Sequence, residues 1–419
     1  MDTLPVIDPG FKELPVDVMN ELAHDFASQA RDGAAGRDST LPMFPAFVRQ
    51  SELSGDPLSV LCLDVGGSTM RATMFRFDQD LHETVSPQEA EFTGGFMTVA
   101  DYTARFADVA RMAVEGHDPD VIALVYSFPA RIVQTGDNID ADRSDLGPEW
   151  GKGFVIADSD INITAYMREA FSKIGISARR WVTLNDVSAL MLARPGVHAS
   201  FIAGTGYNIG VTDAEGDLYN TEAGFYSSPL LSEHNPALLT AFTNDIERRL
   251  LKLDVDPKTN IQLRKPSELQ VGGKYLYQLL IMGLCMIGDC DHETINAIST
   301  LQTGALTSAL NRDWGAFESE KLTLPEHRRN HMHELSVFLR DRAADVVAFQ
   351  LAGAALFKGF SEPLQVTADG SVAHNLPGFT DRISARSTHI YKPGVKITTI
   401  ERSGLSGAAR AAVLTASGR

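Results

Sequence analysis

The sequence predicts an α/β protein of two lobes, each a mixed β-sheet flanked by helices. Runs typical of strands alternate with runs typical of helices in both halves of the chain, as they do in α/β proteins. Each half also holds a turn of glycine and hydroxyl residues between two apolar runs, LDVGGSTMRATMF at 63–75 and FIAGTGYNIGV at 201–211. The glycines begin at Gly66 and Gly204. The repetition indicates a duplicated half-domain that holds one nucleotide from two sides.

The elements of the first half follow from residue spacing. Leu14, Val18, Leu22 and Phe26 share one helical face, which predicts a helix over 13–30. After the glycines that end this pattern, we expect a hairpin over 58–77, a helix over 101–116, a strand over 121–126, a long Asp-rich polar segment without regular structure over 131–150, a helix over 161–174 and a strand over 181–184.

The second half is expected to be richer in helices. Its uncharged run at 275–288 predicts a buried helix and is too short to cross a bilayer. The full order is a helix over 186–192, the second hairpin, a mostly helical region over 236–360, strands over 386–391 and 396–400, and a helix of small residues over 404–414.

Composition excludes several classes of partner. The chain has 419 residues and a net charge of −17, which predicts two or three domains and a surface that repels nucleic acid and anionic lipid. We therefore expect no nucleic acid and no membrane among its partners. The three cysteines form no CxxC pair and the first residues form no signal peptide, so we expect a reduced, cytoplasmic protein.

The two turns have the chemistry of phosphate binding. Glycine allows backbone N–H groups to approach a phosphate closely. Ser68, Thr69 and Thr205 add hydroxyl groups, Arg71 adds a cationic fork, and Asp64 precedes the first turn. One such turn alone is usually a plain hairpin, but two of the same shape favour phosphate binding. Neither turn matches a Walker loop or a dinucleotide-binding fingerprint.

Polar residues at strand ends are the other candidates. Asp186 follows a strand and begins a helix, so it is either a helix N-cap or a general base at the strand's carboxyl end. Ser127 ends another strand, and Lys152 lies between glycines. Glu222 and Glu268 each follow a turn. They are either solvated surface acids or part of a set that binds several hydroxyl groups.

Three histidines at 327–333 are candidate metal ligands. His327 and His331 share a helical face, but no carboxylate or cysteine partner is evident in the sequence, and two arginines intervene. A solvated helical face is therefore favoured over zinc.

The order of these motifs resembles the hexokinase family, the ATP-dependent sugar kinases of the actin-like, or ribonuclease H-like, ATPase fold. The resemblance covers about Leu41 to Leu414. It rests on LPMFP at 41–45, LDVGGS at 63–68, SFP at 127–129 with GKGF at 151–154, LND at 184–186, GTGYN at 204–208, NTE at 220–222, Glu268 with GGKY at 272–275, DGSV at 369–372 and SGLSGAA at 403–409. It implies that nucleotide and sugar bind in the cleft between a small lobe, 58–184 plus 404–419, and a large lobe, 1–57 plus 185–403.

The resemblance also implies a role for each matching residue. Asp186 would take the proton of the sugar's 6-hydroxyl, with Lys152 as its catalytic partner. The other hydroxyls would be held by Ser127, Lys152, Asn185, Asn208, Glu222 and Glu268. The nucleotide would face Asp64, Gly66, Gly67, Ser68, Thr69, Arg71, Gly204, Thr205, Gly206, Ser403 and Gly404. Mg²⁺ would arrive with ATP and have no direct protein ligand, with Asp64 able to reach it through a water.

The implied reaction is ATP-dependent phosphorylation of a hexose at its 6-hydroxyl, the first step of glycolysis, with D-glucose as the expected sugar. The family usually has Thr at position 151, Asn at 69 and Trp at 223, where this chain has Gly151, Thr69 and Ala223. A kinase for mannose, fructose or an amino sugar stays open. Outside that class stand a non-catalytic sugar sensor of the same fold and an ATPase that acts on a protein partner.

Overall fold

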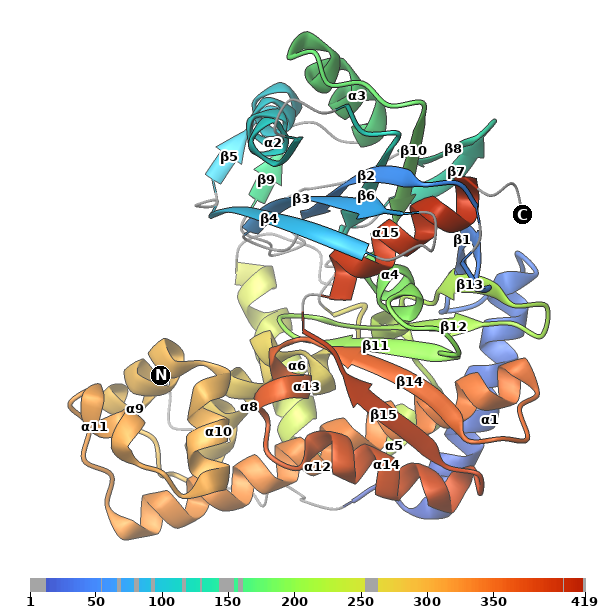
Figure 1. Ribbon diagram of the computed structural model, residues 1–419. Helices are drawn as coiled ribbons and strands as arrows, with labels where there is room; N and C mark the ends of the chain where they lie inside the picture. The colour runs from blue at the N-terminus through green and yellow to red at the C-terminus, as the bar shows by residue number, and fades with distance from the viewer. Residues whose placement is uncertain are drawn as a thin grey trace. The chain divides into compact units, whose positions relative to one another are not determined.

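The computed structural model describes residues 13–53, 55–65, 69–78, 83–91, 95–114, 118–128, 130–142, 154–156, 161–252, 263–401 and 403–416 (Figure 1). The chain divides into two compact units. The helical unit comprises Met1–Pro42, Phe201–Ile209 and Glu222–Thr399, and the seven-stranded unit comprises Met43–Ser200, Gly210–Thr221 and Ile400–Arg419. The lobe boundaries expected from the sequence stay a prediction.

The seven-stranded unit is built on a mixed sheet with the strand order β4-β3-β2-β6-β10-β8-β7. Its centre is parallel: β2, β6, β10 and β8 run in one direction, and β3, β4 and β7 pair antiparallel to their neighbours. The strands are β2 (Leu58–Val65), β3 (Thr69–Phe77), β4 (Glu83–Glu91), β6 (Val121–Tyr126), β7 (Arg131–Thr135), β8 (Asn138–Asp142) and β10 (Arg180–Leu184).

Helices cover both faces of this sheet because its central strands are apolar on both sides. Leu61 and Leu63 of β2 pack in a core with α2 (Val99–Val114) and α3 (Ile163–Lys173). Val60 and Cys62 pack on the opposite side with α4 (Asp186–Leu192) and α15 (Ser403–Ala416). Since side chains alternate along a strand, the run LSVLCLDV supplies both cores.

Smaller strands complete this unit. β1 (Phe44–Arg49) pairs antiparallel with β13 (Asp217–Asn220), which pairs antiparallel with the end of β12 (Tyr207–Thr212). β5 (Gly95–Met97) and β9 (Phe154–Ile156) form a separate parallel pair.

The helical unit is organised around α12 (Glu326–Lys358), a helix of 33 residues. Helix α1 (Val16–Ala34) packs along it. A Cβ at Gly353 of α12 would lie 2.8 Å from the Ala23 carbonyl oxygen, so this glycine permits the close approach. The remaining helices are α5 (Pro229–Glu233), α6 (Ala237–Lys252), α7 (Glu268–Val271), α8 (Gly273–Met286), α9 (His292–Leu301), α10 (Thr303–Asn311), α11 (Gly315–Ser319), α13 (Ser371–Asn375) and α14 (Phe379–Ile390).

The strands of the helical unit follow the order β12-β11-β14-β15. They are the start of β12, the end of β11 (Ala199–Ala203), β14 (Leu364–Asp369) and β15 (Val395–Thr399), with β14 and β15 parallel. Within the described residues, no helix combines the length and apolar character needed to cross a membrane. The expected hairpin over 58–77, the strand over 121–126, the helix over 186–192 and the buried helix near 275–288 are confirmed.

The strand expected over 386–391 is wrong, because this segment is the end of helix α14. Phe379 and Ile383 begin a buried helical face that continues through Arg386. Arg386 can be buried because its Nε donates to Asp345 Oδ1 over 2.5 Å and it also donates to the Leu14 carbonyl. A charged residue in an apolar position thus hid the helical period.

The expectation of no regular structure over 131–150 is wrong for its first part. Residues 131–142 form the antiparallel pair β7 and β8, and residues 143–150 lie outside the described part of the chain. Asp140 is buried in β8 and pairs with Arg168 of α3, and Asp142 pairs with Arg131. These acids face cations, so a strand was possible where the sequence suggested a polar loop.

Candidate active site

In the seven-stranded unit, four candidate residues lie at the same edge of the sheet. The register pairs Asp64 of β2 with Val125 of β6, and Leu184 of β10 with the same Val125. These strands are parallel, so their carboxyl ends meet. Ser127 directly follows β6, and Asn185 with Asp186 directly follows β10. This edge is where ligands bind in open α/β sheets.

Asp186 is the first residue of α4, and the N-cap position belongs to Asn185. Asn185 has extended backbone angles, and its Oδ1 accepts a hydrogen bond from Val187 N over 3.1 Å. Asp186 Oδ1 also accepts from Val187 N, over 2.9 Å. Asp186 thus combines a position at a helix N-terminus, which favours negative charge, with a position at the carboxyl end of a strand.

Asp64 and Arg71 face each other across the first hairpin. They are a cross-strand pair of β2 and β3, and Arg71 Nη1 lies 3.2 Å from Asp64 Oδ2. Both side chains are partly buried. Gly66, Gly67 and Ser68 lie outside the described residues, and so do Gly151 and Lys152. Thr69 begins β3.

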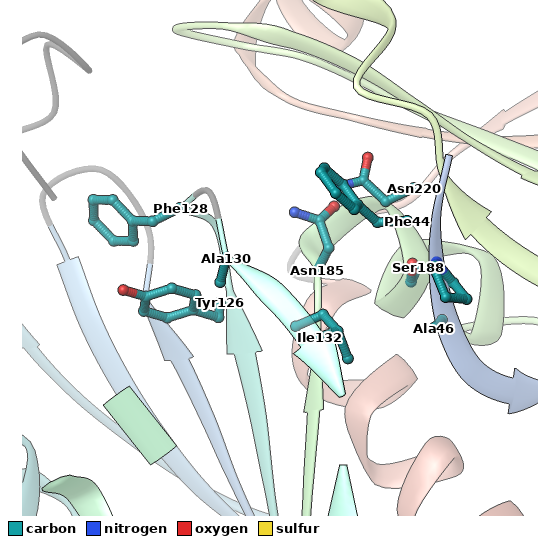
Figure 2. A pocket seen from close by; sticks show the side chains of 10 residues that line it. Phe44, Ala46, Tyr126, Phe128, Ala130, Ile132, Asn185, Ser188 and Asn220 are labelled. Atoms are coloured by element: carbon teal, nitrogen blue, oxygen red, sulfur yellow. The ribbon is translucent and has the colours of Figure 1, made fainter. Parts of the chain in front are cut away.

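A narrow pocket lies beside Asn185 (Figure 2). Its volume is about 10 Å³, which is room for one water or one hydroxyl group. Ser188 also lines it, and its buried Oγ has no hydrogen-bond partner in the described part of the protein. Sequence reasoning missed Ser188, because a serine inside a helix carries no functional signal. The other lining residues are Phe44, Pro45, Ala46, Tyr126, Phe128, Ala130, Ile132 and Asn220.

Helix α15 packs closely on this edge. A Cβ at Gly404 would meet Val125 Cγ1 at 3.6 Å, an ordinary contact, whereas a Cβ at Gly407 would lie 1.8 Å from the Ala189 carbonyl oxygen of α4. Ser403 is buried at the start of the helix. The predicted nucleotide residues Ser403 and Gly404 therefore lie in the same unit as Asp64, next to the strand that separates Asp64 from Asp186.

In the helical unit, the structure gathers Asn208, Glu222 and Glu268. Asn208 Oδ1 accepts a hydrogen bond over 3.1 Å from Ala223 N, the residue after Glu222. Glu268 Oε2 accepts from Tyr207 N over 3.3 Å and lies 3.4 Å from Lys265 Nζ. The three predicted sugar residues are thus joined through the backbone at 207 and 223.

Glycines make room for Glu268. A Cβ at Gly206 would lie 3.1 Å from Glu268 Oε2, and one at Gly224 would lie 3.2 Å from Glu268 Cβ. Glu222 has a φ of +53°. Residues other than glycine adopt this left-handed backbone conformation mainly where the surrounding structure imposes it. Burial, and next the charge of Glu268, raise the pKa of Tyr275 above its usual value, so this phenol stays neutral.

The second turn, Gly204 to Gly206, is held by the start of α8. Gly273 N donates to the Gly204 carbonyl over 2.7 Å, and Lys274 N donates to the Thr205 carbonyl over 3.2 Å. Thr205 itself is exposed. The α8 N–H groups, which have no partner within their helix, thus fix the turn that was predicted to bind phosphate.

The DGSV segment at 369–372 lies directly against this turn. Gly370 has a φ of +103°, and a Cβ there would lie 2.5 Å from the Ala203 carbonyl oxygen. Asp369 Oδ1 accepts from Gly370 N over 2.6 Å and lies 2.9 Å from His374 Nε2. The DGSV motif and the second glycine turn, which are far apart in the sequence, are therefore neighbours in the structure.

The histidine cluster has a carboxylate that the sequence did not reveal. His331 Nδ1 lies 2.8 Å from Asp289 Oδ2, and Arg328 Nε lies 2.8 Å from Asp289 Oδ1. No group of three or more His, Cys, Asp or Glu residues suited to a metal ion occurs among the described residues. Asp289 thus pairs with the cation Arg328 and with His331.

Known structures show the fold. The structure described as hexokinase from Schistosoma mansoni complexed with glucose matches with a TM-score of 0.75 and 17% identity, covering 96% of each chain. A second hexokinase crystal structure matches with the same TM-score and 16% identity, covering 98% of this chain and 97% of the other. The chain therefore has the two-lobed, actin-like ATPase fold predicted from the sequence.

Sequence comparison then gives the family. Two family models, both described as hexokinase, match residues 12–195 and 198–414. Hexokinase-2 of Candida albicans is 21% identical, covering 96% of this chain and 90% of that protein. Hexokinase-1 of Schizosaccharomyces pombe is 24% identical, covering 97% and 89%. The chain belongs to the hexokinase family and is a hexose kinase, as the motif order predicted.

Proposed function

We propose that this protein transfers the γ-phosphoryl group of ATP to the 6-hydroxyl of a hexose, with D-glucose as its main substrate, and so catalyses the first step of glycolysis. The observation that carries the proposal is the position of the Asp186 carboxyl group at the carboxyl end of β10, on the sheet edge that also carries Asp64. The Schistosoma relative was solved with glucose, which supports the choice of sugar.

Asp186 is the proposed general base. Its carboxylate accepts the proton of the 6-hydroxyl as the sugar oxygen forms a bond to the γ-phosphorus and the bond from that phosphorus to the β–γ bridging oxygen breaks. ADP leaves with that oxygen. A base of this kind contributes roughly 10²–10⁴-fold in rate. Lys152 is proposed to assist by its positive charge.

The sugar's other hydroxyls are proposed to bind to the remaining predicted sugar residues. Ser127, Lys152 and Asn185 supply donors and acceptors from the seven-stranded unit. Asn208, Glu222 and Glu268 supply them from the helical unit, where they are joined by the hydrogen bonds of Tyr207 and Ala223. Amide and carboxylate oxygens in one place suit a polyol, because each hydroxyl can donate one hydrogen bond and accept others.

The nucleotide is proposed to contact both glycine turns. Thr205 and the neighbouring backbone would hold phosphate oxygens, as would Arg71 and the turn at 66–69. Ser403 and Gly404 would approach the nucleoside. The full set of proposed nucleotide contacts is Asp64, Gly66, Gly67, Ser68, Thr69, Arg71, Gly204, Thr205, Gly206, Ser403 and Gly404.

Mg²⁺ fits this chemistry as a companion of ATP. Bound to the phosphates, it neutralises the charge that phosphoryl transfer concentrates there. Asp64 has the oxygen ligand that Mg²⁺ prefers, but its Oδ2 lies 3.2 Å from Arg71. We therefore propose contact through a water. No disulfide joins the three cysteines within the described residues, which supports the proposed cytoplasmic location, since reduced thiols persist there.

A panel of hexoses with MgATP tests the function, with ADP release and the position of the product phosphate measured together. We expect glucose to give glucose 6-phosphate. Glucose binding without ADP release would indicate the sensor alternative, and ADP release without a sugar product would indicate an ATPase with another partner. Faster turnover of mannose, fructose or an amino sugar would reassign the substrate.

Asp186→Asn tests the base while keeping size and hydrogen bonding. We expect kcat to fall by roughly 10²-fold or more, with glucose affinity by calorimetry changed little. Asp101→Asn is the matched control, because Asp101 is a carboxylate in the first turn of α2. Near-normal kcat in Asp186→Asn would leave this residue only its contribution to the helix terminus.

A further inference from the structure

A chain of buried hydrogen bonds lies behind the proposed sugar residues of the helical unit. Tyr207 donates from its hydroxyl to Gln350 Oε1 over 2.8 Å, and Gln350 Nε2 donates to Ser267 Oγ over 3.0 Å. Ser267 Oγ in turn donates to the Tyr226 carbonyl over 3.0 Å. All four residues are at most 3% exposed.

These buried hydrogen bonds reach the proposed sugar site at two places, where Tyr207 and Ser267 each directly precede a proposed sugar residue in the sequence. Tyr207 precedes Asn208 in β12, and Ser267 precedes Glu268, the first residue of α7. Alternation along the strand sends the Tyr207 side chain inward and the Asn208 side chain to the opposite side. Tyr207 N also donates to Glu268 Oε2. A shift of Tyr207 would therefore move both proposed sugar residues.

The residue that links Tyr207 to Ser267 must accept one hydrogen bond and donate another. The single proton of Ser267 is used on the Tyr226 carbonyl, so Ser267 must accept a hydrogen bond from Gln350. Burial raises the pKa of Tyr207 well above its usual value, so its phenol keeps its proton and needs an acceptor. The glutamine amide supplies both functions, whereas glutamate would bury a charge.

We propose that Gln350 is a positioning residue of the sugar site, which sets the relative placement of Asn208 and Glu268 through Tyr207 and Ser267. The inference rests on the proposed function, because it takes these two residues to bind sugar. Gln350 lies inside α12, the longest helix of the described chain, so it provides a fixed reference for a strand and a short helix that are far apart in the sequence.

The test is Gln350→Met, which keeps most of the volume and removes both hydrogen bonds. We expect the KM and Kd for D-glucose to rise by roughly three- to tenfold, the effect of one or two buried hydrogen bonds. The KM for ATP should stay within about twofold and kcat should change little, because neither bond reaches Asp186. A loss of stability alone would not raise the KM for glucose while leaving the KM for ATP nearly unchanged.

Tyr207→Phe removes one of the two bonds and is the milder variant if Gln350→Met folds poorly. It should raise the glucose KM in the same direction, and adding it to Gln350→Met should have little further effect, because residues in one network are not additive. Ser336→Ala is the matched control. Ser336 is a buried hydroxyl of the same helix whose Oγ has no hydrogen-bond partner among the described residues, so its glucose KM should be unchanged.

Asn208→Ala and Glu268→Gln, measured in parallel, separate the two hypotheses. If Asn208→Ala and Glu268→Gln raise the glucose KM, but Gln350→Met and Tyr207→Phe have the same glucose KM as Ser336→Ala, the positioning role is wrong and the proposed sugar site stands. If Asn208→Ala and Glu268→Gln leave glucose affinity unchanged, these residues do not bind the sugar, and both the site assignment and the inference drawn from it fail.

Discussion

Gly407 is the position where the structure tolerates a side chain least. A Cβ there would lie 1.8 Å from the Ala189 carbonyl oxygen, 2.5 Å from its carbon and 3.1 Å from the Ala189 Cα. All three atoms belong to the backbone of α4, which cannot change rotamer to avoid the clash. Gly407→Ala would therefore require α15 and α4 to move apart by more than 1 Å, as judged from the 1.8 Å separation.

The cost follows from what these helices cover. Ala408, Ala409, Ala411 and Ala412 of α15 are fully buried in the core shared with β2, β6 and β10, so a displacement opens that core. Overpacking costs about 1–3 kcal/mol where side chains can yield. Here only backbone is in the way, so we expect at least ~3 kcal/mol. Because α4 begins at Asp186, we also expect kcat to fall.

Gly404→Ala is the matched control on the same helix. Its Cβ would meet Val125 at 3.6 Å, an ordinary contact, and alanine favours a helix over glycine by up to ~1 kcal/mol. Urea unfolding followed by circular dichroism should show a large decrease in the free energy of unfolding for Gly407→Ala and little or none for Gly404→Ala. Equal stability of the two variants would refute the reasoning from the α15–α4 contact.

Three further predictions concern charged groups. Burial opposes the shift, but hydrogen bonds at the start of α9 and to Arg328 lower the pKa of Asp291 to about 2. A lowered pKa in the folded state adds stability above about pH 4 that is lost as pH falls toward 2, so the stability advantage of the wild type over Asp291→Ala, about 1 kcal/mol for a helix cap, should shrink between pH 5 and pH 3. Urea titrations measure this advantage, and an increase over that pH range would contradict the assignment. Burial lowers the pKa of Arg342 to about 10, and its Nε donates to Gln270 Oε1 over 2.7 Å; Arg342→Met should therefore cost about 1–3 kcal/mol, because it leaves this buried acceptor without its donor. Arg386→Met should cost more, ~3–5 kcal/mol, because it leaves the buried Asp345 without its cation; equal melting temperatures for the two variants would contradict this difference.

The sequence predicted the fold where one physical signal dominated. The continuous apolar runs of β2 and β6 and the glycines between β2 and β3 gave strands and a hairpin that the structure confirms. The prediction failed where a charged residue occupied an apolar position. Arg386 in α14 and Asp140 in β8 are buried with partners from other elements, and such partners cannot be found from local periodicity.

The candidate site divides in the same way. The residues proposed to contact the substrates could be selected from the sequence, because Asp64, Asn185, Asp186, Asn208 and Glu268 stand next to strand ends and turns. Other residues that the structure shows behind or beside them could not be selected from the sequence. Gln350, Ser188 and Gly407 lie inside helices, where amide, hydroxyl and glycine residues have no distinctive spacing.

What identifies these supporting residues is a contact made by a different segment of the chain. Gly407 is required because the Ala189 carbonyl lies where its Cβ would be, and Gln350 is required because Tyr207 needs an acceptor and Ser267 needs a donor. Neither requirement exists until both segments are folded. The residues proposed to touch the substrates follow from local chemistry, whereas their placement depends on side chains that acquire a role only in the assembled core. We therefore expect substitutions at Gln350 to alter sugar affinity although this side chain makes no contact with the sugar.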